Sequence, residues 1–271
     1  MGKILSSIIV FILSANTYTI IYEERNIDNE SNWNKTTYDI GIEENILPGE
    51  LKPIKGRTTI VSTSSATGWW TYPSDIKGVT KSGDDLLVLV NKEYQLPSTY
   101  APSDLVSASL SGIRKGENFL LRNILINDLK ELVNASIIDE IDLSIRSGYR
   151  SYSTQQSTYD YWLSVNGGSV SSTDKVSARP GHSQHQLGTA VDFSSSEIAD
   201  GLGGTFSSTQ ASIWLANNAW KYGFIISYPS GYESITGYNY ESWHYRYVGK
   251  SNAQAIINSG MILELYLRSK N

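Results

Sequence analysis

The sequence contains no cysteine and only three histidines in 271 residues. The absence of cysteine excludes disulfide bonds and thiolate metal ligands, and it fits an exported protein as well as a cytosolic one. Long basic runs are also missing, and the formal net charge is -5, which argues against a nucleic acid as the partner. With 40% hydrophobic and 18% charged residues, the chain is long enough for one good-sized globular domain and additional segments.

The few histidines lie close to acidic residues. His182 and His185 are three residues apart, Asp192 follows His185 by seven residues, and His244 lies in a later segment. Imidazole and carboxylate groups are ordinary ligands for a divalent metal, and a catalytic zinc ion typically takes three protein ligands. We therefore interpret His185, Asp192 and His244 as a candidate metal-binding set.

The spacing within this set requires a break in the backbone. Residues seven apart on an uninterrupted strand face opposite sides, and Gly188 offers a turn or bulge that would place His185 and Asp192 on the same side. Glu241, three residues before His244, is suited to accept a proton from an attacking water. The alternative is that these residues are scattered over the core and surface, but their concentration beside glycine and alanine makes that interpretation the weaker one.

Several motifs, in order along the chain, resemble those of a known family. They are Ser147-Gly-Tyr-Arg-Ser-Tyr152 with Gln155, Ser183-x-His185-x-x-Gly188-x-Ala190-x-Asp192, the segment 214–224, and Glu241-x-x-His244 followed by Tyr-Arg-Tyr-Val-Gly249. Together they are similar to the signature of the zinc D-alanyl-D-alanine carboxypeptidases, the VanY-like family, over about residues 86–267.

The resemblance implies a fold, a cofactor and a reaction. The fold would be α+β, with a small antiparallel sheet that carries the metal ligands and helices around it, as in the hedgehog and D-Ala-D-Ala peptidase fold. The cofactor would be Zn²⁺, and the substrate would be the peptidoglycan stem peptide, from which the terminal D-alanine is removed. Glu241 would be the catalytic base, and Arg150, Gln155 and Ser183 would contact the substrate. An arginine also suits a terminal carboxylate on chemical grounds, because it donates two parallel hydrogen bonds.

Three alternatives to this function remain. The same zinc machinery serves L,D-carboxypeptidases and D,D-dipeptidases, and the sequence does not settle the stereochemistry. A non-catalytic zinc-containing module that binds the cell wall is the third. The presence of Glu241 favours an enzyme, because a structural site needs no base. We expect a monomer in each case.

Two positions depart from the family pattern. Ser242 stands where relatives commonly have proline between the glutamate and the tryptophan, so the backbone that aims Glu241 is permitted but not enforced. Ser227, just before Tyr228-Pro229, stands where relatives often have arginine. We expect the loss of that charge to alter the preference for peptide length or cross-bridge.

The N-terminal third has a different character. No residue from Ile4 to Tyr22 is charged, so we interpret residues 1–25 as a signal peptide or an uncleaved membrane anchor, with a buried helix as the weakest alternative. Either form would place the protein outside the cytoplasm, anchored or secreted. Residues 26–82 are expected to be a polar linker and residues 83–271 the peptidase domain. We expect the aromatic pair Trp69-Trp70 to pack on that domain rather than to contact the cell wall.

The pattern of apolar residues predicts the elements of this domain. Strands are expected at 85–90, 141–145, 224–228 and 244–248, helices at 117–135, 153–163, 207–222, 253–257 and 262–267, and a hairpin-like excursion at 231–240. In the helix ending at Tyr222, capped by Ser207 or Ser208, the buried side is expected to carry Ile213, Trp214, Ala216 and Trp220. His182 is expected to be structural or to support the ligands.

Overall fold

A computed structural model describes the backbone of residues 4–14, 17–26, 33–41 and 71–270. The chain divides into two compact units, Met1–Ser65 and Ala66–Asn271. In the first unit, β1 (Ile4–Ser14), β2 (Thr17–Asn26) and β3 (Trp33–Gly41) form an antiparallel sheet in that order. Within the described ranges, no helix has the length and apolar character needed to cross a bilayer. The signal or anchor function of residues 1–25 stays a prediction, and Trp69-Trp70 lies outside the described residues.

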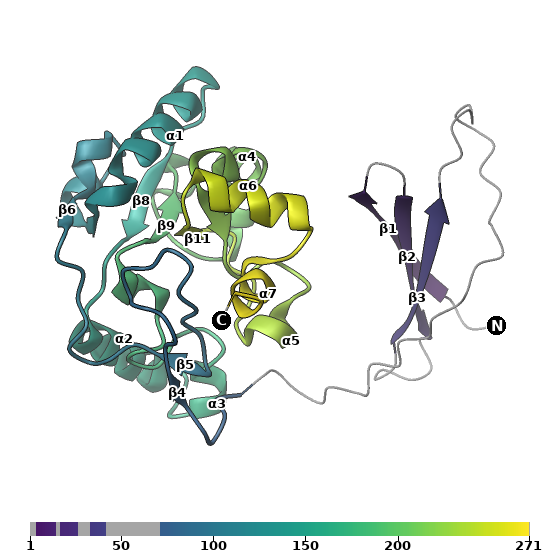
Figure 1. Cartoon of the computed structure of the whole chain (residues 1–271), viewed down its shortest axis with the longest axis horizontal. Coiled ribbons are helices and arrows are strands. Elements are labelled where there is room, and N and C mark those ends of the chain that lie inside the picture. Colours follow the sequence, from purple (N-terminus) through teal and green to yellow (C-terminus); the bar gives the residue numbers. More distant parts are fainter. Residues whose placement is uncertain (1–3, 15–16, 27–32, 42–70, 271) are drawn as a thin grey trace. The chain divides into compact units, whose positions relative to one another are not determined.

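The second unit contains the antiparallel sheet that the sequence predicts. Its four strands are β8 (Ser144–Ser147), β9 (Ala190–Ser194), β10 (Phe224–Ile226) and β11 (His244–Tyr247), in the spatial order β10-β11-β9-β8. Helices and loops surround this sheet in Figure 1. The α+β prediction is therefore confirmed.

The remaining elements of the second unit are short. The helices are α1 (Ile126–Ile138), α2 (Tyr152–Val165), α3 (Val170–Thr173), α4 (Gln210–Asn218), α5 (Glu233–Thr236), α6 (Lys250–Ser259) and α7 (Leu263–Arg268). Two small strand pairs accompany them: β4 (Lys77–Gly78) with β5 (Tyr94–Gln95), and β6 (Leu105–Ser107) with β7 (Leu120–Arg122). Residues 71–82, which the sequence assigns to the linker, thus include a strand of the second unit.

One face of the central sheet forms the main hydrophobic core. Side chains alternate between the two faces of a strand, so Val191 and Phe193 of β9 share a face with Tyr245 of β11. These three side chains are buried together with residues of α1 and α4, including Leu129 and Trp214. The residues between them, Asp192 in β9 and its strand partner His244, therefore belong to the opposite face.

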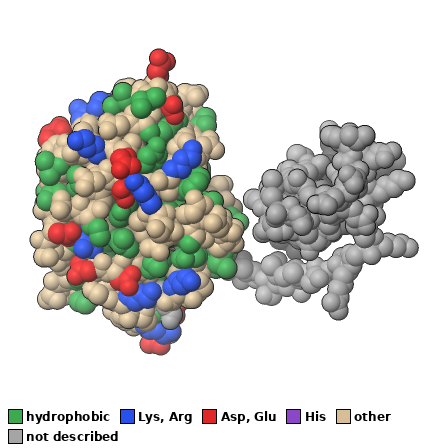
Figure 2. Space-filling model, turned by 45° about the horizontal axis from the view of Figure 1, so that its top comes forward, with side chains coloured by type: hydrophobic (Ala, Val, Ile, Leu, Met, Phe, Trp, Pro, Cys, Tyr) green, Lys and Arg blue, Asp and Glu red, His purple; other side chains and the backbone are tan. Residues whose placement is uncertain are grey.

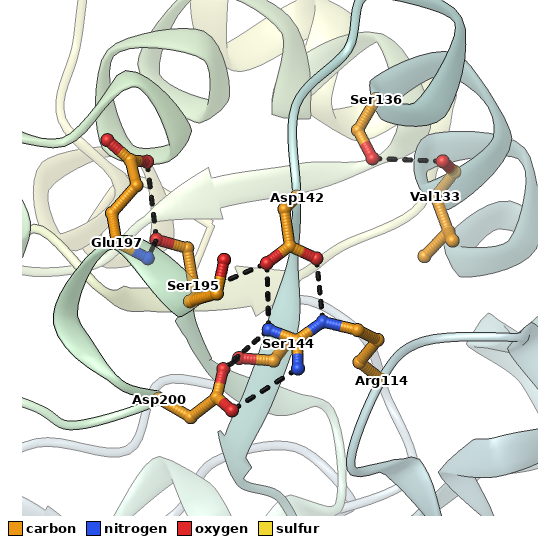
Figure 3. A network of polar contacts seen from close by, with 9 residues as sticks. Arg114, Val133, Ser136, Asp142, Ser144, Ser195, Glu197 and Asp200 are labelled. Carbon is orange, nitrogen blue, oxygen red and sulfur yellow. Dashed lines mark hydrogen bonds and ion pairs between the residues drawn. The ribbon is translucent and has the colours of Figure 1, made fainter.

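A polar network fixes the end of β8 to the loop after β9 (Figure 3). The guanidinium group of Arg114 donates hydrogen bonds to Asp142 and Asp200, and the hydroxyl of Ser144 donates to the same Asp200 carboxylate. In the same loop, the carboxylate of Glu197 accepts hydrogen bonds from the backbone N–H groups at the start of α4. These contacts link β8, the loop after β9 and the start of α4.

Two predicted elements are wrong. Residues 85–90 form no strand: the carbonyls of Leu86 and Val88 accept hydrogen bonds from the guanidinium group of Arg246 and not from a neighbouring strand. The helix predicted at 117–135 begins only at Ile126, since the preceding residues form β7, which pairs with β6. An apolar run of this kind fits both the repeat of a helix and the alternation of a strand, and pairing with a distant segment decides between the two.

Other boundaries shift by a few residues. The helix before Gly223 is split into α4 and a 3₁₀ turn (Ala219–Tyr222), and Thr209 rather than Ser207 or Ser208 caps it. Ile213 and Ala216 are exposed, whereas Trp214 is buried. The excursion at 231–240 contains the short helix α5 instead of a hairpin. The expected helix at 153–163 is present as α2.

The surface shows no dominant charge on the face drawn in Figure 2, where acidic and basic side chains alternate among polar and apolar ones. Such a face offers no continuous positive strip for a phosphate backbone.

Gly188 supports the ligand segment through its backbone conformation, which leads to a testable prediction. It ends a 3₁₀ turn with φ +66°, and an added Cβ would lie 3.0 Å from both Arg122 Cγ and Leu105 Cδ2. At Gly167, φ is +62° but nothing lies within 4 Å. We expect each glycine-to-alanine change to cost about 1–2 kcal/mol of unfolding free energy for the left-handed backbone, with Gly188→Ala costing ~1 kcal/mol more for crowding. Urea denaturation measures both, and equal losses would contradict the crowding argument.

Candidate active site

Strand register brings two of the predicted ligands, Asp192 and His244, together. Asp192 and His244 are direct partners in the antiparallel pairing of β9 with β11. Directly paired residues project from the same face of a sheet, so the carboxylate and the imidazole meet without any loop rearrangement. Asp192 Oδ1 lies 2.9 Å from His244 Nδ1.

A tight turn brings the third ligand to them. His185 lies on a 3₁₀ turn (Gln184–Leu187) that is capped by the Ser183 hydroxyl and ends at Gly188. Its Nε2 is 3.2 Å from Asp192 Oδ2, and the ligand atoms of the three residues all lie within 4.8 Å of one another. Gly188 therefore supplies the break in the backbone that the spacing requires, as a turn and not as a bulge.

The hydrogen bonds of both imidazoles leave the inward nitrogens without a proton. His185 Nδ1–H donates to the carbonyl of Gly148 at 2.7 Å, and His244 Nε2–H donates to Gln184 Oε1 at 3.2 Å. The other nitrogen of each ring then points its lone pair at Asp192, whose Oδ1 has no hydrogen bond among the described residues. Three electron-rich atoms facing one another in a buried site repel unless a cation lies between them. This donor set thus fits a divalent metal ion.

The ionisation state of His185 agrees with this arrangement. Burial lowers the pKa of His185 to about 4, so its imidazole is neutral at neutral pH. A neutral imidazole is the form that coordinates a metal. The site is therefore ready to bind an ion without first losing a proton from this residue.

Glu241 lies beside the ligands, in the turn that precedes β11. A turn in which the His244 N–H donates to the Glu241 carbonyl places Glu241 Oε2 3.7 Å from His244 Nδ1. Burial, and then the charge of Asp192, raises the pKa of Glu241 well above its ordinary value, while Arg150 opposes this shift. A carboxylate with a raised pKa holds a proton more strongly, which suits proton transfer.

A cavity of about 430 Å³ opens beside these groups, and the predicted substrate-binding residues line it. Arg150 Nε has no hydrogen-bond partner among the described residues, so it can donate to a bound anion. Gln155 is buried and donates to the Ala178 carbonyl, which leaves its own amide oxygen without a partner in the described part. Ser183 lines the same wall.

Further residues of this cavity escaped the sequence analysis. Tyr228 packs its ring against His244 with centroids 4.9 Å apart, and Trp162, Leu202 and Tyr240 line the cavity with partly exposed side chains. Tyr228 and Tyr240 belong to a short stretch rich in tyrosine, the one signal by which they could have been found.

His182 stays apart from the ligands. Its Nδ1–H donates to the carbonyl of Asn91 at 2.7 Å, and its ring contacts Tyr72 edge to face. The Tyr72 hydroxyl in turn accepts a hydrogen bond from the Arg179 N–H at 2.9 Å. These contacts agree with a structural role for His182, and they show an aromatic residue of the preceding segment packed on this domain.

Comparisons with known proteins agree with this geometry. Residues 118–250 match the model of the family described as VanY, D-alanyl-D-alanine carboxypeptidase. The putative carboxypeptidase YodJ of Bacillus subtilis (strain 168) is 40% identical over 202 residues, which cover 72% of this chain and 73% of YodJ.

Two solved structures are also similar. One is the LdcB LD-carboxypeptidase, with a TM-score of 0.64 and 37% identity over 72% of this chain and 91% of that one. The other is a variant of the vancomycin-resistance D,D-pentapeptidase VanY in complex with Zn(II), with a TM-score of 0.56 and 31% identity over 67% of this chain and 98% of that one. The chain belongs to the VanY family of D-alanyl-D-alanine carboxypeptidases.

Proposed function

We propose that this protein is a zinc-dependent carboxypeptidase that removes the C-terminal D-alanine from peptidoglycan stem peptides. The observation that carries the proposal is the convergence of three proton-free ligand atoms, from His185, Asp192 and His244, beside the carboxylate of Glu241 and an arginine in one cavity. A structural metal site has no use for the last two groups. The Zn(II) complex of a similar structure supports zinc as the ion.

The residues divide the reaction between them. When bound, the zinc ion polarises the scissile carbonyl and lowers the pKa of water. Glu241 accepts the proton of the attacking water and returns it to the leaving amine. Arg150 holds the terminal carboxylate through paired hydrogen bonds, while Gln155 and Ser183 contact the peptide along the same wall. Burial of these groups strengthens their electrostatic effect on the developing charge.

The role of Arg150 leads to a prediction about substrate recognition. Arg150→Ala removes the charge-assisted contact to the carboxylate, so kcat/KM should fall on the order of a hundredfold for free-acid peptides. Arg150→Lys should recover only part of the loss, because an ammonium group lacks the flat two-pronged geometry. The measurement compares free-acid and C-terminally amidated peptides. If Arg150→Ala cleaves the free-acid and the amidated peptides as well as the parent does, the enzyme does not recognise the C-terminus and is an endopeptidase.

The experiment that tests the function is incubation with defined peptides. Purified protein, with and without a chelator, is given a pentapeptide ending in D-Ala-D-Ala, a tetrapeptide ending in one D-Ala and the free dipeptide D-Ala-D-Ala, and the products are identified by mass. We expect chelator-sensitive release of one D-alanine from the pentapeptide. Release from the tetrapeptide alone would establish an L,D-carboxypeptidase, and release of D-alanine from free D-Ala-D-Ala alone would establish a dipeptidase. No cleavage at all would favour a wall-binding module.

We further propose that the protein acts outside the cytoplasmic membrane, where such peptides are found. The uncharged run from Ile4 to Tyr22 supports this, as do the acidic residues that follow it. A reporter enzyme that works only outside the cytoplasm should be active when it is fused to the C-terminus of the full chain. A fused reporter that is active only in the cytoplasm would contradict export.

A further inference from the structure

Behind His244, on the side away from Asp192, lies a pair of buried polar residues that the mechanism does not use. Gln184 Oε1 accepts two hydrogen bonds, one from the His244 Nε2–H at 3.2 Å and one from the Ser227 hydroxyl at 2.8 Å. Gln184, Ser227 and His244 are 3%, 2% and 4% exposed, so bulk water does not replace these partners. Neither Gln184 nor Ser227 lines the cavity, and so neither is placed to touch the substrate.

From this geometry we infer that Gln184 and Ser227 are positioning residues that fix the proton of His244 on Nε2 and thereby keep Nδ1 free for the metal. The inference rests on the proposed function only in taking zinc as the ion.

The chemistry of the amide explains why its orientation matters. A carboxamide has one accepting end and one donating end. With the oxygen toward His244, the ring must carry its proton on Nε2. With the amide reversed, its NH₂ group would face Nε2, the proton would move to Nδ1, and the nitrogen beside Asp192 could no longer coordinate a metal. The state of this amide therefore determines whether His244 is a ligand.

Ser227 holds the amide in place from the second side. Its backbone is tied to the same strand, because the Ser227 N–H donates to the His244 carbonyl at 3.1 Å. The hydroxyl therefore lies at a fixed position relative to the imidazole. A glutamine side chain has several rotatable bonds, and the second hydrogen bond restricts it to the rotamer that faces the ring.

This finding changes the interpretation of Ser227. The sequence suggested that the absence of arginine here alters substrate preference, but the side chain is buried and is absent from the cavity wall. The neutral hydroxyl of Ser227 matches the neutral amide of Gln184, so the pair supports His244 without adding a buried charge. The effect of this position should appear in metal binding and not in peptide choice.

The test measures zinc affinity by competition with a chromophoric chelator. Gln184→Leu should weaken zinc binding ten- to a hundredfold, the usual loss when the outer partner of a ligand histidine is removed. Gln184→Glu keeps an acceptor in the same place, so its zinc affinity should lie within a few-fold of that of the parent. Ser227→Ala should weaken binding less than Gln184→Leu, and it should add little in the double variant, because both act through one amide.

Ser242 provides the matched control. It is buried to 2% exposure, it lies next to Glu241 in sequence, and its hydroxyl has no hydrogen-bond partner in the part of the chain that the structure describes. Ser242→Ala should therefore leave zinc affinity unchanged. An equal loss in Ser242→Ala and Ser227→Ala would reduce the effect to general packing and overturn the inference.

A second readout does not depend on catalysis. NMR of the zinc-loaded protein should show a His244 Nε2–H proton that exchanges slowly with solvent in the parent and in Gln184→Glu, and faster in Gln184→Leu. A rapidly exchanging Nε2–H in the parent, or unchanged zinc affinity in folded Gln184→Leu, would overturn the inference. If Gln184→Leu does not fold, unchanged zinc affinity in Ser227→Ala would overturn it. A protein that binds zinc as expected but releases no D-alanine would refute the proposed function and leave this inference standing.

Discussion

Glu241→Gln is expected to lower kcat on the order of a hundredfold or more, the usual contribution of a general base. The two side chains have nearly the same shape, but an amide cannot accept the proton of the attacking water. Glu241 is not one of the three ligands whose atoms converge, so the variant should retain its zinc. KM should change little, because Arg150 still holds the terminal carboxylate.

Two measurements accompany this rate. Metal analysis of the variant should give the same zinc content as the parent, which separates loss of the base from loss of the ion. Glu117→Gln, a change at an exposed acid that does not line the cavity, should keep full turnover. Full turnover in Glu241→Gln would mean that another group takes the proton.

Replacement of His185, Asp192 or His244 by alanine is expected to have an even larger effect, because each change removes a direct ligand. Zinc affinity should fall by more than the ten- to hundredfold typical of outer partners, and activity should fall with it. The three variants should resemble one another, since a site with two protein ligands holds the ion poorly whichever ligand is lost. Equilibrium dialysis followed by metal analysis measures the zinc content of each variant.

The third histidine of the chain is the natural control. His182 is buried like His185, but its ring donates to the Asn91 carbonyl and it is not one of the three converging residues. His182→Ala should lower the unfolding free energy by about 1–3 kcal/mol, the cost of leaving a buried carbonyl unpaired, and it should keep one zinc per chain. Undiminished zinc in all three ligand variants would refute the assignment of the metal site.

The sequence was informative where the chemistry is local and rare. Three histidines, a glycine at the right place and one glutamate were enough to predict which groups meet, and the structure brings His185, Asp192 and His244 within reach of one another. The register that makes Asp192 and His244 direct partners could not be predicted, because it depends on pairing between strands some fifty residues apart. The support of His244 by Gln184 and Ser227 depends on the same pairing.

The wrongly predicted elements of the fold have a related cause. The segment at 85–90 has the composition of a strand, yet its carbonyls are bonded by Arg246, a residue about 160 positions later. Likewise, the residues before Ile126 fit a helical stripe but pair with β6 as a strand. An apolar run indicates that a segment packs against the core, while contacts that are distant in the sequence decide its backbone conformation.

The most direct test of the central claim is zinc titration of the metal-free enzyme while D-alanine release from the pentapeptide is followed. If the cavity is a mononuclear zinc peptidase site, release should rise linearly with added zinc and reach its plateau at one equivalent per chain, with Glu241→Gln binding the same equivalent and releasing almost none. Release of D-alanine at full rate without metal, or equal release by Glu241→Gln at one equivalent, would contradict the account.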